Sequence, residues 1–218
     1  MSRRFDPSLL PPVPDLSIER ALWEAGIDNI AGVDEAGRGA LAGPVVAAAV
    51  VFPPSITIQA ELQGVNDSKQ LSPRQRDELA KIVHRIALAW GVGFSLHSEI
   101  DQLGIVPATH LAAHRAVEEI ELHIDHLLLD YLFLPEVGIP QTNLIKGDQR
   151  SVSIAAASIL AKTARDKLLI DLDSEFPGYH FAAHKGYATS QHLADLNRLG
   201  PSPIHRRTFA PVKEWIAS

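Results

Sequence analysis

The sequence contains no cysteine among its 218 residues. This absence excludes disulfide bonds, zinc sites built from thiolates and catalysis by a cysteine nucleophile. Any metal ion must therefore be held by oxygen atoms or by imidazole nitrogens. The composition is compatible with an intracellular protein, and we expect a cytoplasmic location.

The sequence also lacks an apolar run long enough to span a membrane. Its longest run, residues 41–52, contains Gly43 and Pro44 and has about half the length that a transmembrane helix needs. Residues 1–15 are interrupted by four prolines and offer no continuous apolar core for a signal peptide. We therefore expect no contact with membranes, and we interpret residues 1–15 as a flexible proline-rich leader.

Positive charge is scarce as well. The chain has 20 Lys and Arg against 26 Asp and Glu, which gives a formal net charge of −6. A protein that coats nucleic acid relies on basic residues, so the net charge argues against such a coat. A nuclease, however, needs acidic metal ligands as well as basic phosphate contacts. The local clusters of charge are therefore more informative than their sum.

The apolar pattern predicts an α/β protein. Four segments have the composition of strands: residues 29–33, 45–52, 90–96 and 126–132. Five segments have helical periodicity or helix-start signals: residues 17–25, 72–86, 107–120, 153–172 and 190–199. This order favours one domain, residues 16–218, with a helical C-terminal appendage from about residue 175.

Two neighbouring acids, Asp34 and Glu35, stand at the end of the first predicted strand, before a glycine-rich turn at residues 36–39. Neighbouring strand residues point to opposite faces, so both acids reach one site only if the strand ends near Asp34. For an isolated Asp-Glu pair, a solvated turn is the simpler interpretation.

A dinucleotide-binding loop is an alternative interpretation of the same segment, because Gly37, Gly39 and Gly43 approximate a glycine fingerprint after a strand. The spacing is one residue too long, however, and a strand rather than a helix is expected to follow. The two carboxylates would also repel a pyrophosphate. These features make the alternative weak.

Two further acids lie where a carboxylate needs an explanation. Asp130 is embedded in an apolar run, where it requires a metal, an arginine or exposure at the end of the strand. Asp148 follows Lys146 and Gly147 just before the long predicted helix, where capping that helix is the simpler role. If these two acids converge with the Asp-Glu pair, four carboxylates would balance two hard dications, and oxygen ligands favour Mg²⁺ or Mn²⁺.

Basic residues also form small groups, and Tyr187 lies beside one of them. The groups are Lys69 in Asp67-Ser68-Lys69, Lys162 with Arg165, His184-Lys185, and His205-Arg206-Arg207. Each group alone is more often solvated surface than a phosphate site. Together they could line a groove in which Tyr187 stacks on a sugar or base, although packing is the commoner role of a loop tyrosine.

These motifs resemble the ribonuclease HII family. The resemblance covers residues 30–212 and rests on Asp34-Glu35-Ala36-Gly37-Arg38-Gly39, Leu41-Ala42-Gly43-Pro44-Val45, Asn66-Asp67-Ser68-Lys69, Lys146-Gly147-Asp148 and residues 153–166, 184–189 and 200–211. It implies a ribonuclease H-like α/β fold, with a central mixed sheet flanked by helices and a helical C-terminal part.

The resemblance also implies an activity and the residues that carry it. Members are metal-dependent endoribonucleases that hydrolyse the RNA strand of RNA/DNA hybrids and cut 5′ to single ribonucleotides in duplex DNA, leaving 3′-hydroxyl and 5′-phosphate ends. By resemblance, the ligands of two Mg²⁺ or Mn²⁺ ions are Asp34, Glu35, Asp130 and Asp148. The segment Gly37-Arg38-Gly39 would present backbone groups to the ribose 2′-hydroxyl, which distinguishes RNA from DNA. Tyr187 would pack on the sugar, phosphates would contact Lys69, Lys146 and Lys185, and the protein is expected to be a monomer.

Three positions depart from the family pattern: Ala40 replaces the usual proline, Tyr131 a frequent glycine after the third acid, and Ala188 a common glycine. Tyr131 alone adjoins a predicted ligand and bears on the turn after Asp130. Asp166 is a competing acid, which we interpret as structural. Two other functions stay open: a nucleic-acid-binding module without catalysis, which the intact acids disfavour, and a nucleotide-binding oxidoreductase, which the glycine spacing disfavours.

Overall fold

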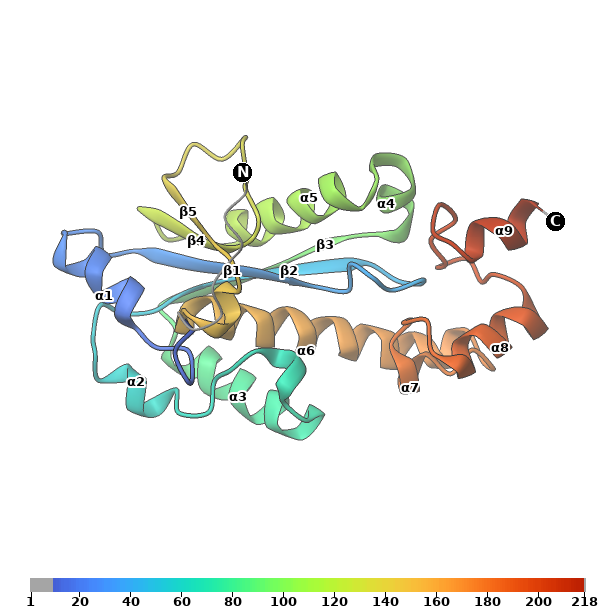
Figure 1. Ribbon diagram of the computed structural model, residues 1–218, viewed down its shortest axis with the longest axis horizontal. Coiled ribbons are helices and arrows are strands. Elements are labelled where there is room, and N and C mark those ends of the chain that lie inside the picture. The colour runs from blue at the N-terminus through green and yellow to red at the C-terminus, as the bar shows by residue number, and fades with distance from the viewer. Residues whose placement is uncertain (1–9, 218) are drawn as a thin grey trace.

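The computed structural model describes residues 10–217 and is built around a five-stranded mixed sheet (Figure 1). The strands follow the order β3-β2-β1-β4-β5. Strand β1 pairs antiparallel with β2 and parallel with β4, while β2 pairs antiparallel with β3 and β4 pairs parallel with β5. The bounds are Ile30–Ala36 (β1), Val45–Val51 (β2), Ala89–Ser95 (β3), His126–Asp130 (β4) and Gln141–Leu144 (β5). The predicted mixed sheet is confirmed.

Helices cover both faces of this sheet. Helix α5 (Ile105–Glu118) packs on β3 and β2, and the long helix α6 (Val152–Glu175) crosses β1 and β2 on the opposite face, with α3 (Pro73–Ile86) against it (Figure 1). The other helices are α1 (Ser17–Glu24), α2 (Ile58–Glu61), α4 (His97–Leu103), α7 (Phe181–His184), α8 (Ser190–Leu199) and α9 (Val212–Ala217), with 3-10 turns η2 (Ser68–Gln70) and η3 (Gly147–Gln149). Among the described residues, none of the helices has both the length and the apolar character needed to cross a membrane.

Strand β2 is buried along its whole length, which explains its continuous apolar composition. Its side chains alternate between two cores: Val50 packs in the core under α6, and Ala49 packs in the core under α5. Strand β1 approaches α6 even more closely, because a Cβ added at Gly32 would lie 2.2 Å from the carbonyl carbon of Ser153. Helix α6 is thus held tightly against the strand that carries the first predicted acids.

The predicted core strands and longer helices are present, but some of their bounds differ and several short elements were not predicted. The predicted capping box of α3 is present, since Gln75 N–H donates to Ser72 Oγ and Ser72 N–H donates to the Gln75 side chain. Strand β1 extends past the predicted end at residue 33 to Ala36. Strand β5 was not predicted, because three of its four residues are polar and lie outside the buried core.

The two ends of the chain pack differently. Residues 1–9 of the predicted leader lie outside the described residues, but Pro14 is buried and Asp15 forms a backbone bridge with Ser151. The C-terminal helices α7, α8 and α9 lie beyond one end of the sheet, next to the end of α6 (Figure 1). A second isolated bridge, between Ala42 and His205, joins this C-terminal part to the connection between β1 and β2.

Candidate active site

Three carboxylates from separate segments meet at one end of the parallel strands. Asp34 lies on β1 and Asp130 ends β4, which is the parallel neighbour of β1. Asp148 lies in η3, just after β5, and the N–H of Gly147 donates to Oδ1 of Asp130 at 2.7 Å. Oxygen atoms from the three carboxylates all lie within 4.8 Å of one another. We call these three residues the acidic cluster.

Glu35 lies next to the acidic cluster without being a member of it. Because β1 continues to Ala36, the side chains of Asp34 and Glu35 leave the strand in opposite directions. One Glu35 oxygen forms an ion pair with Arg38 at 3.1 Å. The other oxygen, Oε2, is buried and has no hydrogen-bond partner among the described residues. A bound cation would satisfy such a buried carboxylate oxygen.

Burial and mutual repulsion raise the pKa values of the cluster. Burial is the largest cause for Asp34, followed by the negative charges of Glu35 and Asp130, and the pKa of Asp34 is well above its usual value. Burial, followed by the charge of Asp130, raises the pKa of Asp148 from 3.8 to about 6. Several buried carboxylates that repel one another are the condition that a bound dication relieves.

The donor set fits a hard divalent cation. Within residues 10–217, the acidic cluster is the one group of three His, Asp or Glu residues close enough to hold a metal ion. Its ligand atoms are all carboxylate oxygens, which Mg²⁺ and Mn²⁺ prefer over soft ligands. Glu35 is close enough for its charge to raise the pKa of Asp34 and for the charge of Asp130 to raise its own, so its unpartnered oxygen is a fourth candidate ligand.

Lys69 is a positively charged residue on which the carboxylates of the acidic cluster act electrostatically. Burial lowers the pKa of its ammonium group, but the charges of Asp34, Asp67 and other nearby acids outweigh this effect, so the net shift is upward. The Lys69 N–H also donates to Asp67 Oδ1 at 2.9 Å, which fixes the start of η2. Lys146 is exposed and takes a left-handed conformation with φ 56° at the start of η3.

The connection between β1 and β2, residues 37–44, carries the predicted substrate loop, which we call loop 37–44. Gly37 has φ 94°, and a Cβ there would lie 2.0 Å from Nε of Arg165. A Cβ at Gly39 would meet no heavy atom within 4 Å. The two glycines therefore have different structural roles. Gly37 leaves room for the buried side chain of Arg165, whereas Gly39 borders open space.

Tyr187 and Lys185 lie next to this loop. The carbonyl of Gly186 accepts a hydrogen bond from Leu41 N–H at 2.8 Å, which joins the two segments. The Tyr187 ring is half-buried, with the Lys162 ammonium 5.2 Å from its centroid. The Lys185 ammonium donates a hydrogen bond to the carbonyl of Ala182, within the short helix α7 that Lys185 follows.

Known proteins resemble this chain along nearly its whole length. The ribonuclease HII family model matches residues 31–212. The chain belongs to the ribonuclease HII family. The ribonuclease HII of Dehalococcoides mccartyi is 48% identical over 205 residues, covering 92% of this chain and 94% of that protein. The ribonuclease HII of Chloroflexus aurantiacus is 51% identical over 207 residues, covering 94% and 98%. The crystal structure of ribonuclease H2 from Pyrococcus horikoshii superposes with a TM-score of 0.70 at 25% identity, covering 86% and 96%.

Membership of the ribonuclease HII family makes the chain a hydrolase, a metal-dependent endoribonuclease. The oxidoreductase alternative fails on the fold as well. Loop 37–44 leads into strand β2, so no helix N-terminus follows the glycines to receive a pyrophosphate. The predicted competitor Asp166 forms ion pairs with Arg76 at 3.2 Å and Lys162 at 2.6 Å.

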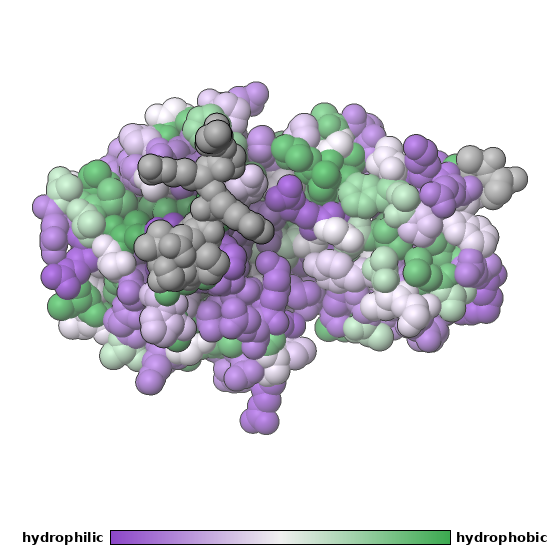
Figure 2. Space-filling view, in the orientation of Figure 1, coloured by the Kyte–Doolittle hydropathy of each residue, from purple (hydrophilic) through white to green (hydrophobic). Residues whose placement is uncertain are grey.

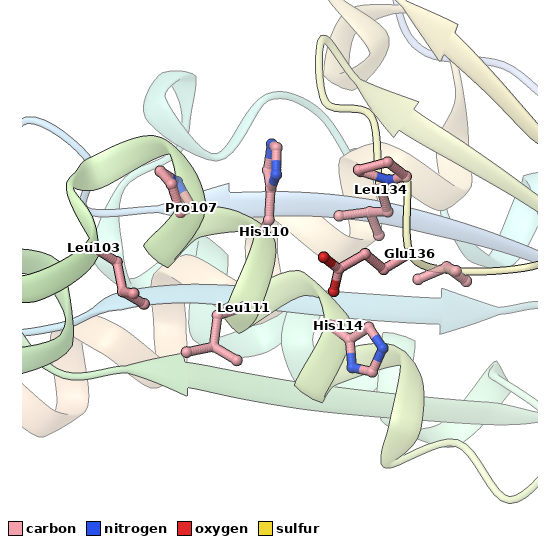
Figure 3. A pocket seen from close by; sticks show the side chains of 9 residues that line it. Leu103, Pro107, His110, Leu111, His114, Leu134 and Glu136 are labelled. Carbon is pink, nitrogen blue, oxygen red and sulfur yellow. The ribbon is translucent and has the colours of Figure 1, made fainter.

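The surface of this ribonuclease HII carries a polar region (Figure 2) and a hollow that lies away from the acidic cluster. Hydrophilic side chains gather across the middle of the face drawn in Figure 2. A separate hollow of about 410 Å³ lies between α5 and residues 134–137, with His110 and Glu136 on its wall (Figure 3). No residue of the acidic cluster lines this hollow, so it is distinct from the active site.

The departures from the ribonuclease HII pattern have local structural consequences. Tyr131 takes a left-handed conformation with φ 50°, a region that glycine enters without the steric cost of a side chain. Its side chain is 76% exposed, so the strained backbone does not disturb the packing around Asp130. Ala40 is fully buried and Ala188 is exposed.

Sequence reasoning missed that two of the grouped cations are buried. Arg165 and Arg206 belong to basic groups interpreted as solvated surface or as the lining of a groove, but both are 0% exposed. For Arg165 a signal existed: it lies four residues from both Ala161 and Leu169 on α6, which are buried on the same helix face. No local pattern distinguishes Arg206 from its exposed neighbour Arg207.

Proposed function

We propose that this ribonuclease HII hydrolyses the RNA strand of RNA/DNA hybrids and also cuts 5′ to single ribonucleotides embedded in duplex DNA. The products would carry 3′-hydroxyl and 5′-phosphate ends. The observation that carries the proposal is the convergence of Asp34, Asp130 and Asp148 within 4.8 Å, close to a glycine loop whose outer side is open.

The proposed metal ligands are the acidic cluster and Glu35, in a two-metal mechanism with Mg²⁺ or Mn²⁺. Such cations supply positive charge for the leaving oxygen and lower the pKa of a water molecule, so that hydrolysis proceeds at neutral pH. The protein's own contribution is to hold the carboxylates in place, while the positive charge of the cations would favour their ionised form. The hydrogen bond from Gly147 to Asp130 and the strand pairing of β1 with β4 fix two of them.

Substrate recognition is proposed for the residues around loop 37–44. Backbone groups of Gly37, Arg38 and Gly39 would contact the ribose 2′-hydroxyl, and glycine allows the close approach that a side chain would block. Tyr187 would pack on the sugar next to the cut. Lys69 and Lys146 are the proposed phosphate contacts, and Lys185 would need to leave the Ala182 carbonyl to become one.

The proposal extends to the whole molecule. Residues 16–218 would act as one catalytic domain, because the C-terminal part that begins near residue 175 bonds directly to loop 37–44. We also propose a monomeric protein in the cytoplasm, as the family resemblance implies.

The test uses a labelled DNA duplex with one ribonucleotide, incubated with the purified protein in Mg²⁺, Mn²⁺ or chelator. We expect metal-dependent cleavage at the 5′ side of the ribonucleotide and loss of cleavage by more than about 100-fold in Asp34→Asn, since even an outer-shell metal partner is worth up to that factor. The control is Asp77→Asn, an exposed acid on α3 with the same change of charge. Binding of the duplex without cleavage in either metal would overturn the enzymatic proposal.

A further inference from the structure

Two buried arginines hold loop 37–44 through its main chain. Arg165 projects from α6, and Arg206 belongs to the segment between α8 and α9. Their guanidinium groups donate six hydrogen bonds of 2.7 to 3.0 Å to main-chain carbonyls: Arg165 to Ala42, Pro44 and Lys185, and Arg206 to Gly37, Arg38 and Gly43. Five of the six acceptors therefore lie in the loop.

Neither arginine has a carboxylate partner. Within residues 10–217, no carboxylate oxygen of Asp or Glu lies within 4.0 Å of a guanidinium nitrogen of Arg165 or Arg206. Burial, and then the positive charge of Arg165, lower the pKa of Arg206 to about 9. Burying two like charges without a counter-charge disfavours folding, and a neutral side chain would fill the space more cheaply. The arrangement therefore points to a purpose other than stability.

The peptide geometry shows what the arginines achieve. A peptide unit is planar and trans, so its C=O and its N–H point in opposite directions. Since the carbonyls of Gly37 and Arg38 accept from Arg206, the N–H groups of Arg38 and Gly39 must point away from the buried guanidinium. Neither N–H donates a hydrogen bond to another described residue. The next N–H along the chain, that of Ala40, donates to the Gly37 carbonyl.

Both residues that carry these N–H groups, Arg38 and Gly39, are exposed. A Cβ at Gly39 would also meet no heavy atom within 4 Å, so no other described residue packs on this part of the loop. The opposite side is filled, because Arg165 occupies the space that a Gly37 side chain would take. Loop 37–44 is thus polarised, with its carbonyls turned inward and two free donors turned outward.

We propose that Arg206, supported by Arg165, is a positioning residue for the recognition of RNA. It fixes the carbonyls of Gly37 and Arg38 inward and thereby aims the N–H groups of Arg38 and Gly39 at the 2′-oxygen of the substrate ribose. This inference rests on the proposed function of the loop. The C-terminal part would then contribute to the discrimination between RNA and DNA. The backbone N–H of Arg206 also donates to Leu41 O at 2.8 Å, which ties this part to the loop.

The test replaces Arg206 by lysine, which keeps the charge but cannot span three carbonyls with a rigid fork. Affinities are measured by fluorescence anisotropy in Mg²⁺, in an Asp34→Asn background that does not cleave. Two duplexes are compared, identical except for one ribonucleotide or deoxyribonucleotide. The exposed Arg85→Lys, on α3 and 68% solvent-accessible, is the control.

We expect the Asp34→Asn parent to prefer the ribonucleotide duplex and the added Arg206→Lys change to reduce that preference by roughly tenfold, the worth of one or two hydrogen bonds. Affinity for the all-DNA duplex should not change. A general structural defect would instead lower the affinity for both duplexes. Retained preference in a folded Arg206→Lys protein would overturn the positioning role alone. No preference in the parent would overturn the proposed ribose recognition and, with it, this inference.

A second pair of variants decides the question if Arg206→Lys does not fold. Arg38→Pro and Arg38→Ala both remove the side chain, but the proline alone also removes the N–H that Arg206 aims outward. The preference for the ribonucleotide duplex should fall further in Arg38→Pro than in Arg38→Ala. Equal preferences in the two variants would show that this N–H is not a contact and would overturn the proposal.

Discussion

Replacing Asp148 by asparagine should stabilise the metal-free protein while it abolishes cleavage. Burial raises the pKa of Asp148 from 3.8 to about 6. Between these two values the folded protein binds more protons than the unfolded chain, so this group makes stability fall as pH rises through that window, and the loss persists at higher pH. The difference corresponds to at most about 3 kcal/mol of unfolding free energy at pH 8.

Urea unfolding in chelator, at pH 5 and at pH 8, measures this effect. Asp148→Asn should exceed the wild type by up to about 3 kcal/mol at pH 8 and by less at pH 5. The exposed Asp77→Asn should stay within about 0.5 kcal/mol of the wild type. Added Mg²⁺ or Mn²⁺ should then stabilise the wild type more than Asp148→Asn. A variant that is less stable than the wild type at pH 8 in chelator, or that has the same pH dependence, would refute the reasoning.

The other predictions concern loop 37–44 and the buried histidines. Gly37→Ala should lower the unfolding free energy by roughly 2 kcal/mol, because its Cβ would lie 2.0 Å from Arg165 Nε. Gly39→Ala should alter stability by less than about 0.5 kcal/mol, because its Cβ would meet no heavy atom within 4 Å. Equal urea midpoints for the two variants would contradict this distinction. Burial lowers the pKa values of His192 and His205 to about 4, so NMR should find both rings neutral at pH 6. Because these pKa values lie below that of an unfolded histidine, their contribution to stability is lost as pH falls from 6.5 toward 4, and a ring that titrates above pH 6 would disprove it.

The sequence by itself determined the core strands, the longer helices and the chemistry available to them. The continuous apolar run of β2 and the capping box of α3 depend on neighbouring residues, so they could be predicted without a partner segment. The absence of cysteine limited any metal to oxygen or nitrogen ligands. The motif around Asp34 and Glu35 led to the family, which the comparisons confirm.

Only the tertiary structure decided how these residues meet. Asp34 and Asp130 come together because β1 and β4 are parallel neighbours, while the alternation of β1 directs Glu35 away from Asp34. The position of Asp148 depends on β5, a strand too short and polar to be predicted. Arg206 reaches the Gly37 carbonyl across 169 residues of sequence. Burial and side-chain direction depend on contacts between distant segments, which no local pattern encodes.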